Sequence, residues 1–174
     1  DYTKAIEINP NYGEAYSNRG IGKNVLKDYY GAISDYTKAI EINPNDAARY
    51  YNIGNAKTYL NDYYGAISDF TKAIEINPNY TDAYFNRGLS KKLLKDYYGA
   101  ISDYTKIIEI NPNDALAYRY RGNTNIDLKD YYGAISDYTK SIEINPNDAA
   151  SYFNRGLGKY WLDDYNGACI DARK

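Results

Sequence analysis

Asparagine residues recur at a regular spacing along this chain, and their side-chain amides are suited to binding a peptide backbone. The four asparagines lie at multiples of 34 residues from one another: Asn18, Asn52, Asn86 and Asn154. A tyrosine, Tyr120, takes the remaining position of the row. An amide carries donors and an acceptor, so a row of amides along a groove can hold an extended peptide whatever its side chains. The alternative is that these amides hydrogen-bond to neighbouring helices and serve only the fold.

Charged side chains form a second periodic set. Arginines and aspartates recur in two matching columns: Arg19, Arg87, Arg121 and Arg155, with Asp35, Asp69, Asp103, Asp137 and Asp171. An unpaired buried charge is costly, so we expect structural Arg–Asp ion pairs that link helices within or between repeating units. The functional alternative is an arginine stripe that binds anions.

The repeating units differ from one another at a small number of positions, and several of these carry large apolar side chains. They are Tyr51, Phe85, Leu89, Phe153, Leu157, Tyr160 and Trp161. Large apolar side chains on an open surface are candidate anchors for a partner protein. Between the apolar residues of the third and fifth units, we expect a polar patch of Arg119, Asn123 and Asp127. The alternative is that some of the apolar side chains pack on the adjacent unit.

Composition excludes most catalytic and metal-binding chemistry. The chain has no histidine and one cysteine, Cys169, so zinc, haem and iron–sulfur sites and histidine-based triads are not expected. We therefore predict no catalytic residue, no metal, no cofactor and no enzyme activity. With 21 basic and 23 acidic residues, the chain lacks the basic footprint of a nucleic-acid-binding protein. No apolar run could span a bilayer and no signal segment is visible, so we expect no membrane partner and a cytoplasmic location.

The spacing of apolar residues predicts two helices in each unit. In residues 13–46, a first helix is expected over 14–26, and Asp28 is placed to cap a second helix. The second helix carries an apolar stripe of helical period: Ala32, Ile33, Tyr36, Ala39 and Ile40. Asn43 and Pro44 should end it, because proline cannot continue the hydrogen-bond ladder. Each unit is therefore a helix–turn–helix hairpin that cannot bury its apolar face alone.

Two further features follow the turn inside each hairpin. A pair of tyrosines, Tyr29 and Tyr30 in the first unit, is interpreted as packing residues, although an aromatic ligand strip is the alternative. Gly31 lies one residue later, in the first turn of the second helix. A glycine there costs about 1 kcal/mol against alanine, so we infer a close backbone approach at this position.

These units resemble the tetratricopeptide repeat, whose pattern is W-x2-L-G-x2-Y, A-x3-F and P in 34 residues. The first unit matches with Tyr16, Gly20, Ala32, Tyr36 and Pro44, and later units match in the same register. This chain usually has arginine at the leucine position of the pattern and lysine at its tyrosine position. The resemblance implies an all-α fold, a right-handed superhelical solenoid of antiparallel helix-turn-helix hairpins with a 34-residue period.

The repeat register divides the whole chain, residues 1–174, into one array. We expect the end of a preceding repeat, specifically the second half of its second helix, in residues 1–12. Four complete repeats follow, and an incomplete fifth repeat closes the array: 13–46, 47–80, 81–114, 115–148 and 149–174. We expect further chain on both sides in the native protein.

The resemblance also assigns a function to the first helices, which line the concave groove in this family. It implies that the asparagine row and the variable positions bind a peptide, as in the asparagine ladder of O-linked N-acetylglucosamine transferases. Arg119, Asn123 and Asn154 partly match the clamp that holds a C-terminal carboxylate in chaperone-tail receptors. We expect a scaffold that binds an extended peptide or helix of a partner protein. The alternatives are an assembly module that self-associates through repeat ends or its convex face, and a non-catalytic region of a larger multidomain protein.

Overall fold

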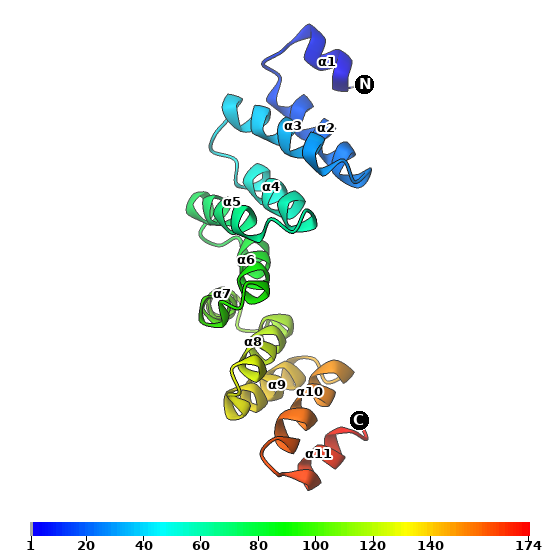
Figure 1. The fold of residues 1–174 in the computed structure, drawn as a ribbon, viewed down its shortest axis with the longest axis vertical. Helices are drawn as coiled ribbons and strands as arrows, with labels where there is room; N and C mark the ends of the chain where they lie inside the picture. Colours follow the sequence, from blue (N-terminus) through cyan, green and yellow to red (C-terminus); the bar gives the residue numbers. More distant parts are fainter. Residues whose placement is uncertain (1) are drawn as a thin grey trace. The chain divides into compact units, whose positions relative to one another are not determined.

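The computed structural model describes residues 2–174, and that part of the chain contains eleven helices and no strand (Figure 1). The chain divides into two compact units, Asp1–Ser90 and Lys91–Lys174. The first unit contains α1 (Tyr2–Ile8), α2 (Gly13–Val25), α3 (Tyr29–Ile42), α4 (Ala47–Tyr59), α5 (Tyr63–Ile76) and most of α6 (Thr81–Leu93). The second contains α7 (Tyr97–Ile110), α8 (Ala115–Asp127), α9 (Tyr131–Ile144), α10 (Ala149–Tyr160) and α11 (Tyr165–Asp171). The predicted all-α class is confirmed.

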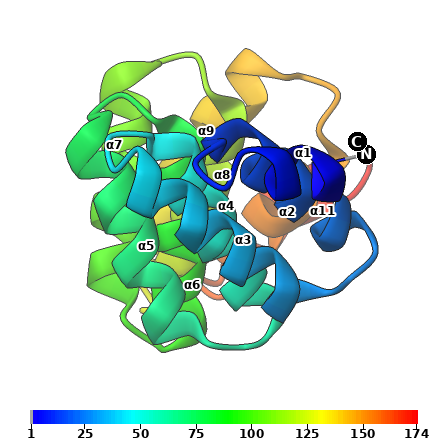
Figure 2. The same ribbon diagram turned by 90° about the horizontal axis from the view of Figure 1, so that it is seen from above.

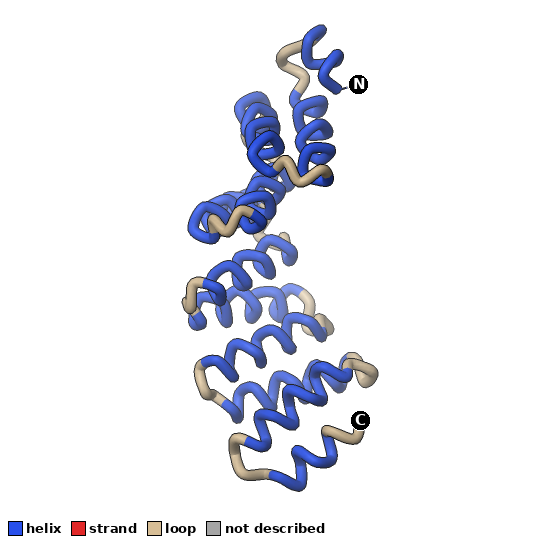
Figure 3. Tube along the Cα trace, turned by 45° about the vertical axis from the view of Figure 1, so that its right-hand side comes forward, coloured by secondary structure: helices blue, strands red, loops and turns tan. Residues whose placement is uncertain are grey.

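Consecutive helices pack as hairpins, and short loops join them (Figure 3). In the first unit α2 packs against α3 and α4 against α5, while α3 also packs against α4 of the next hairpin. In the same unit α1 lies against α2 (Figure 2). In the second unit α8 pairs with α9 and α10 with α11, and α9 also packs against α10. The predicted hairpins of 34-residue period are therefore confirmed.

Aspartate caps begin the second helices and explain the glycine in their first turn. The Asp28 carboxylate accepts a hydrogen bond from the Gly31 backbone N–H at 2.9 Å, and four later repeats form the same cap. A Cβ atom built on Gly31 would collide with the Asp28 carboxylate. The close approach inferred from the sequence therefore exists, but a capping side chain makes it, whereas a backbone was expected.

The core of each complete repeat contains a buried aromatic ring of the second helix, and in the first, second and fourth repeats this ring lies against a glycine of the first helix. These rings are at most 1% exposed: Tyr36, Phe70, Tyr104 and Tyr138. A Cβ on Gly20 would lie 2.8 Å from the Tyr36 ring, and one on Gly54 would lie 2.6 Å from the Phe70 ring. The Tyr36 ring also packs with Ile53 of the next hairpin. This ring therefore joins three helices into one core.

The two tyrosines after each hairpin turn have different environments. Tyr29 stacks on Tyr59 with ring centroids 5.0 Å apart, and Tyr131 stacks on Trp161 at 6.3 Å. The second tyrosine of each complete pair is 75–77% exposed: Tyr30, Tyr64, Tyr98 and Tyr132. The packing interpretation holds for the first tyrosine and is wrong for the second, which projects from the helix into solvent.

Candidate functional site

The arginine and aspartate columns meet inside the hairpins of the first, fourth and fifth repeats. Arg19 donates from Nε and Nη2 to the two carboxylate oxygens of Asp35, at 2.8 and 2.7 Å. The same paired geometry joins Arg121 to Asp137 and Arg155 to Asp171. These three aspartates are at most 4% exposed. Each buried carboxylate is thus held by a bidentate arginine, which is the strong form of such a contact.

A lysine column, whose role sequence reasoning missed, supplies a second donor to the same carboxylates. Lys23 Nζ lies 2.8 Å from Asp35, and Lys159 Nζ lies 2.8 Å from Asp171. Lys57 and Lys91 contact Asp69 and Asp103 in the same way. In the fourth repeat Asn125 donates to Asp137 at 3.1 Å. The signal was present in the sequence, because this lysine follows the arginine by one helical turn and so lies on the same face.

Burial and hydrogen bonding oppose each other in setting the pKa of these carboxyls. Burial raises the pKa of Asp35, but hydrogen bonds from Arg19 and Lys23 outweigh it, so the net pKa lies below the usual value. Burial also raises the pKa of Asp171, but hydrogen bonds from Arg155 and Lys159 outweigh burial, so that pKa too lies below the usual value. The second repeat has Ile53 where the other repeats have arginine, so Asp69 lacks that partner. Burial dominates there and raises the pKa of Asp69.

These shifts predict a loss of stability in acid. A carboxyl whose folded pKa is lowered stabilises the protein above its unfolded pKa of about 3.9, and this contribution disappears as pH falls through the folded pKa. The free energy of unfolding, measured by urea denaturation between about pH 2 and pH 6, should therefore fall on acidification, and Asp35→Asn should reduce that slope. Asp69→Asn is the matched control: a raised folded pKa opposes the trend, so its removal should not reduce the slope. An unchanged slope in Asp35→Asn would contradict the assignment.

A pocket of about 410 Å³ lies on the first helices of the first unit, and we call it the amide pocket. Residues of α2, α4 and α6 line it: Asn24, Tyr51, Asn55, Thr58, Tyr59, Asn86 and Leu89. Asn86 Nδ2 donates to Asn55 Oδ1 at 2.9 Å and to the Tyr51 hydroxyl at 3.1 Å. All seven side chains are uncharged, so the pocket presents amide, hydroxyl and apolar groups together.

The other members of the asparagine row lie in different settings. Asn154 Nδ2 donates to Asn123 Oδ1 at 3.0 Å, which repeats the Asn86–Asn55 contact in the second unit. Asn18 and Asn52 are half-buried and do not line the amide pocket. Two amides of the row, Asn86 and Asn154, therefore hydrogen-bond to the neighbouring first helix, and Asn86 also lines a pocket.

The polar patch of the second unit is bonded internally. Asn123 Oδ1 also accepts a hydrogen bond from the Tyr138 hydroxyl at 2.8 Å. Arg119 Nε lies 3.4 Å from Asp148 Oδ2. The Arg119 guanidinium carbon lies over the Tyr120 ring, 5.6 Å from the ring centroid. The groups that partly match a carboxylate clamp are thus turned toward protein partners in this structure.

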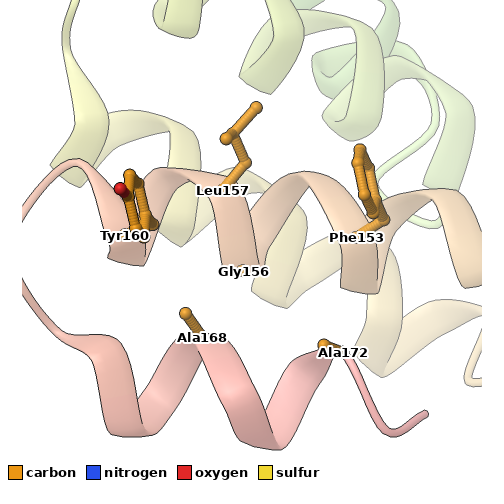
Figure 4. Close-up of a pocket in the computed structure, with 6 residues that line it drawn as sticks. All are labelled: Phe153, Gly156, Leu157, Tyr160, Ala168 and Ala172. Atoms are coloured by element: carbon orange, nitrogen blue, oxygen red, sulfur yellow. The ribbon is translucent and has the colours of Figure 1, made fainter.

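A second, smaller pocket of about 210 Å³ lies between α10 and α11, and we call it the ring slot. Phe153, Gly156, Leu157 and Tyr160 line it from α10, while Ala168 and Ala172 face α10 from the other side (Figure 4). Trp161 stays 54% exposed beside it. Phe85, in contrast, is half-buried on α6 and lines neither pocket.

The sequence model of the tetratricopeptide repeat matches residues 13–46, 47–80, 81–114 and 115–148. The chain belongs to the tetratricopeptide repeat family. A comparison with curated protein sequences gives no match. Among residues 2–174 no group of three or more histidine, cysteine or acidic side chains is placed to hold a metal ion, and no helix there is long and apolar enough to cross a membrane.

Solved structures of other tetratricopeptide repeat proteins share this fold. MamA superposes with a TM-score of 0.87 at 23% identity, over 92% of this chain and 88% of that one. YrrB, described as a tetratricopeptide repeat protein with an unusual peptide-binding site, gives 0.82 at 24% identity, over 98% and 88%. PilF of Pseudomonas aeruginosa gives 0.80 at 19% identity, over 98% and 78%. At these identities the likeness shows the fold alone.

Proposed function

We propose that this tetratricopeptide repeat chain is a protein-interaction module that binds an extended peptide of a partner protein in the amide pocket. The observation that carries the proposal is the pocket itself, which is built from three successive first helices and lined by amides. In this family the first helices line the groove, and YrrB is a fold relative whose structure is described by its peptide-binding site.

The chemistry of the pocket favours an extended peptide over a helix. The Asn86–Asn55 hydrogen bond uses the donor group of one amide and the acceptor of the other, so Asn86 Oδ1 and Asn55 Nδ2 lie outside that bond. A donor and an acceptor side by side match the N–H and C=O of an extended backbone. A helical ligand has these groups bonded internally and could not use the pair. Tyr59 and Leu89 add apolar contact for a ligand side chain.

Peptide selection followed by a matched pair of variants tests the proposal. Peptides selected on this chain from a displayed library would be measured by fluorescence anisotropy against wild type, Asn86→Ala and Asn154→Ala. Both asparagines donate to an asparagine of the preceding repeat, but only Asn86 lines the amide pocket. We expect Asn86→Ala to weaken binding about tenfold, through lost and unsatisfied hydrogen bonds.

Asn154→Ala should leave the affinity within about twofold, and circular dichroism should show both variants fully helical. Equal loss in the two variants would place binding outside the amide pocket. Unchanged affinity in Asn86→Ala would remove the role given to the amide pair.

A further inference from the structure

Asn24 brings an unsatisfied hydrogen-bond acceptor to the amide pocket. Its Oδ1 atom is buried and has no hydrogen-bond partner among residues 2–174, although the side chain lines the pocket. The hydroxyl of Thr58, which lines the same pocket, does not supply the missing proton, because it donates to the Gly54 carbonyl at 3.0 Å. A buried acceptor without a donor destabilises a folded chain, so native proteins retain few of them. A ligand that brings a donor into the pocket removes this cost.

Asn24 also belongs to a diagonal series of amides that crosses three successive first helices. Asn24, Asn55 and Asn86 are 31 residues apart, which is one repeat of 34 less about one helical turn. Asn86 donates to Asn55 across this spacing, and Asn154 donates to Asn123 across the same spacing in the second unit. In register, Asn24 therefore follows Asn55 as Asn55 follows Asn86. The Asn24 acceptor and the Asn55 Nδ2 donor, which that Asn86 bond does not use, line one pocket.

The corresponding series of the second unit begins with a charged pair. Lys92 stands two repeats after Asn24, and its Nζ lies 3.0 Å from Asp127 Oδ2. Tyr59 stands two repeats before Asp127 and lines the amide pocket with a neutral ring. Neutral groups therefore take the places of both charges in the first unit. An acceptor that is open and uncharged distinguishes the amide pocket from the equivalent place in the second unit.

We propose that the amide pocket selects a glutamine or asparagine side chain of the bound peptide, an inference that rests on the peptide binding proposed above. The ligand NH₂ group donates to Asn24 Oδ1, and the ligand amide oxygen accepts from Asn55 Nδ2. Asn55 Nδ2 carries two N–H groups, so one remains for the ligand backbone.

The other classes of ligand side chain fit these groups less well. An apolar side chain would leave the Asn24 oxygen unsatisfied. A charged side chain would lose its water in a pocket whose lining has no opposite charge. A hydroxyl donates and accepts at one oxygen, so both pocket groups would have to converge on a single point. A carboxamide carries its donor and its acceptor on separate atoms and can bond Asn24 and Asn55 at once.

Parallel peptide selections on wild type and Asn24→Leu test this specificity. Leucine is close to asparagine in shape but has no hydrogen-bonding group. From a displayed library of random peptides, wild type should enrich glutamine or asparagine at one position, and Asn24→Leu should enrich leucine or methionine there. In fluorescence anisotropy, changing that ligand amide to leucine should weaken binding to wild type about tenfold, and binding to Asn24→Leu less than about twofold.

Asn18→Leu is the matched control, because Asn18 is half-buried on the same helix α2 and does not line the pocket. It should select the same peptides as wild type. Both substitutions raise helix propensity equally, but only Asn24→Leu removes an unsatisfied buried oxygen. The urea midpoint of Asn24→Leu should therefore exceed that of Asn18→Leu. An equal or lower midpoint would show that the chain itself satisfies the Asn24 oxygen, and the proposal would fail.

The selections also separate this specificity from peptide binding itself. An apolar, charged or hydroxyl residue in place of the amide on wild type, or one consensus shared by wild type and Asn24→Leu, would overturn the amide selection. Peptide binding in the pocket would still stand in that case, provided that Asn86→Ala weakens the affinity. Failure to select any peptide on wild type would overturn both proposals.

Discussion

Gly20→Ala should destabilise the protein by about 2 kcal/mol, whereas Gly22→Ala, two residues later in the same helix, should stabilise it by about 0.5–1 kcal/mol. The two glycines differ only in what surrounds them. A Cβ at Gly20 would lie 2.8 Å from the buried Tyr36 ring, while a Cβ at Gly22 meets nothing within 4 Å. The first change overpacks a core that joins three helices. The second only removes the conformational freedom of a glycine in an exposed helical position.

Urea denaturation followed by circular dichroism measures both effects on one scale. Because repeat arrays can unfold in stages, hydrogen exchange on α2 and α3 should accompany the global measurement. Opposite signs for the two substitutions are the expected result. If Gly20→Ala were neutral or stabilising, the Tyr36 ring would not lie against this glycine as the structure places it.

Asp137→Ala should destabilise the protein by about 3 kcal/mol, near the low end for breaking a buried ion pair, since the Arg121 side chain remains 20% exposed. Asp137 accepts two hydrogen bonds from Arg121 and one from Asn125. Removing the carboxylate leaves an arginine and an amide in a largely buried place without their acceptor. The cost comes from those unsatisfied donors rather than from the lost attraction itself.

Two controls separate this cost from a general effect of charge. Glu143→Gln breaks the surface pair with Lys140, in which both side chains are 55–56% exposed, and should leave the unfolding free energy nearly unchanged because water screens the pair. A double variant, Arg121→Leu with Asp137→Ala, removes both partners and should recover much of the stability lost in the single variant. A double variant as unstable as the sum of its parts would argue against an unsatisfied arginine as the cause.

The periodic features could be predicted from the sequence because the same residue types recur at the same positions in successive repeats. Aspartate caps, Asn-Pro helix ends and the apolar stripe of the second helix are local signals, and each recurs at a fixed spacing. The lysine one helical turn after Arg19, Arg87 and Arg155 is also visible in the sequence, but comparison with the family pattern marks it only as a departure from the pattern's tyrosine and does not indicate a second donor to the same aspartate. The exposure of Tyr30 could have been foreseen, since successive helical residues point about 100° apart and cannot both pack on one neighbour.

The two pockets could not be predicted, because each depends on how separate helices approach. Asn24, Asn55, Thr58 and Tyr59 lie on first helices, but only the packing of α2, α4 and α6 brings them together with Asn86. The ring slot depends on Ala172, a small residue that stands 34 positions after the buried Tyr138. The sequence shows this difference, but only the structure shows that the Tyr138 ring lies against Gly122 in the fourth repeat. Period alone carries no information on such distances.

The arginines have a consequence for how the chain loses its structure. Arg121 and Arg155 reach back from their own hairpin to Thr105 and Thr139 of the preceding one, and Arg87 reaches Thr71. At the junction where Ile53 replaces arginine, Arg49 crosses instead, bonding Ser17 and the Ala39 carbonyl. Every such junction is therefore held by a guanidinium. A single repeat cannot unfold without breaking hydrogen bonds between an arginine and the adjacent hairpin. Local unfolding should therefore involve two neighbouring hairpins together. Amide hydrogen exchange should then show cooperative units larger than one repeat.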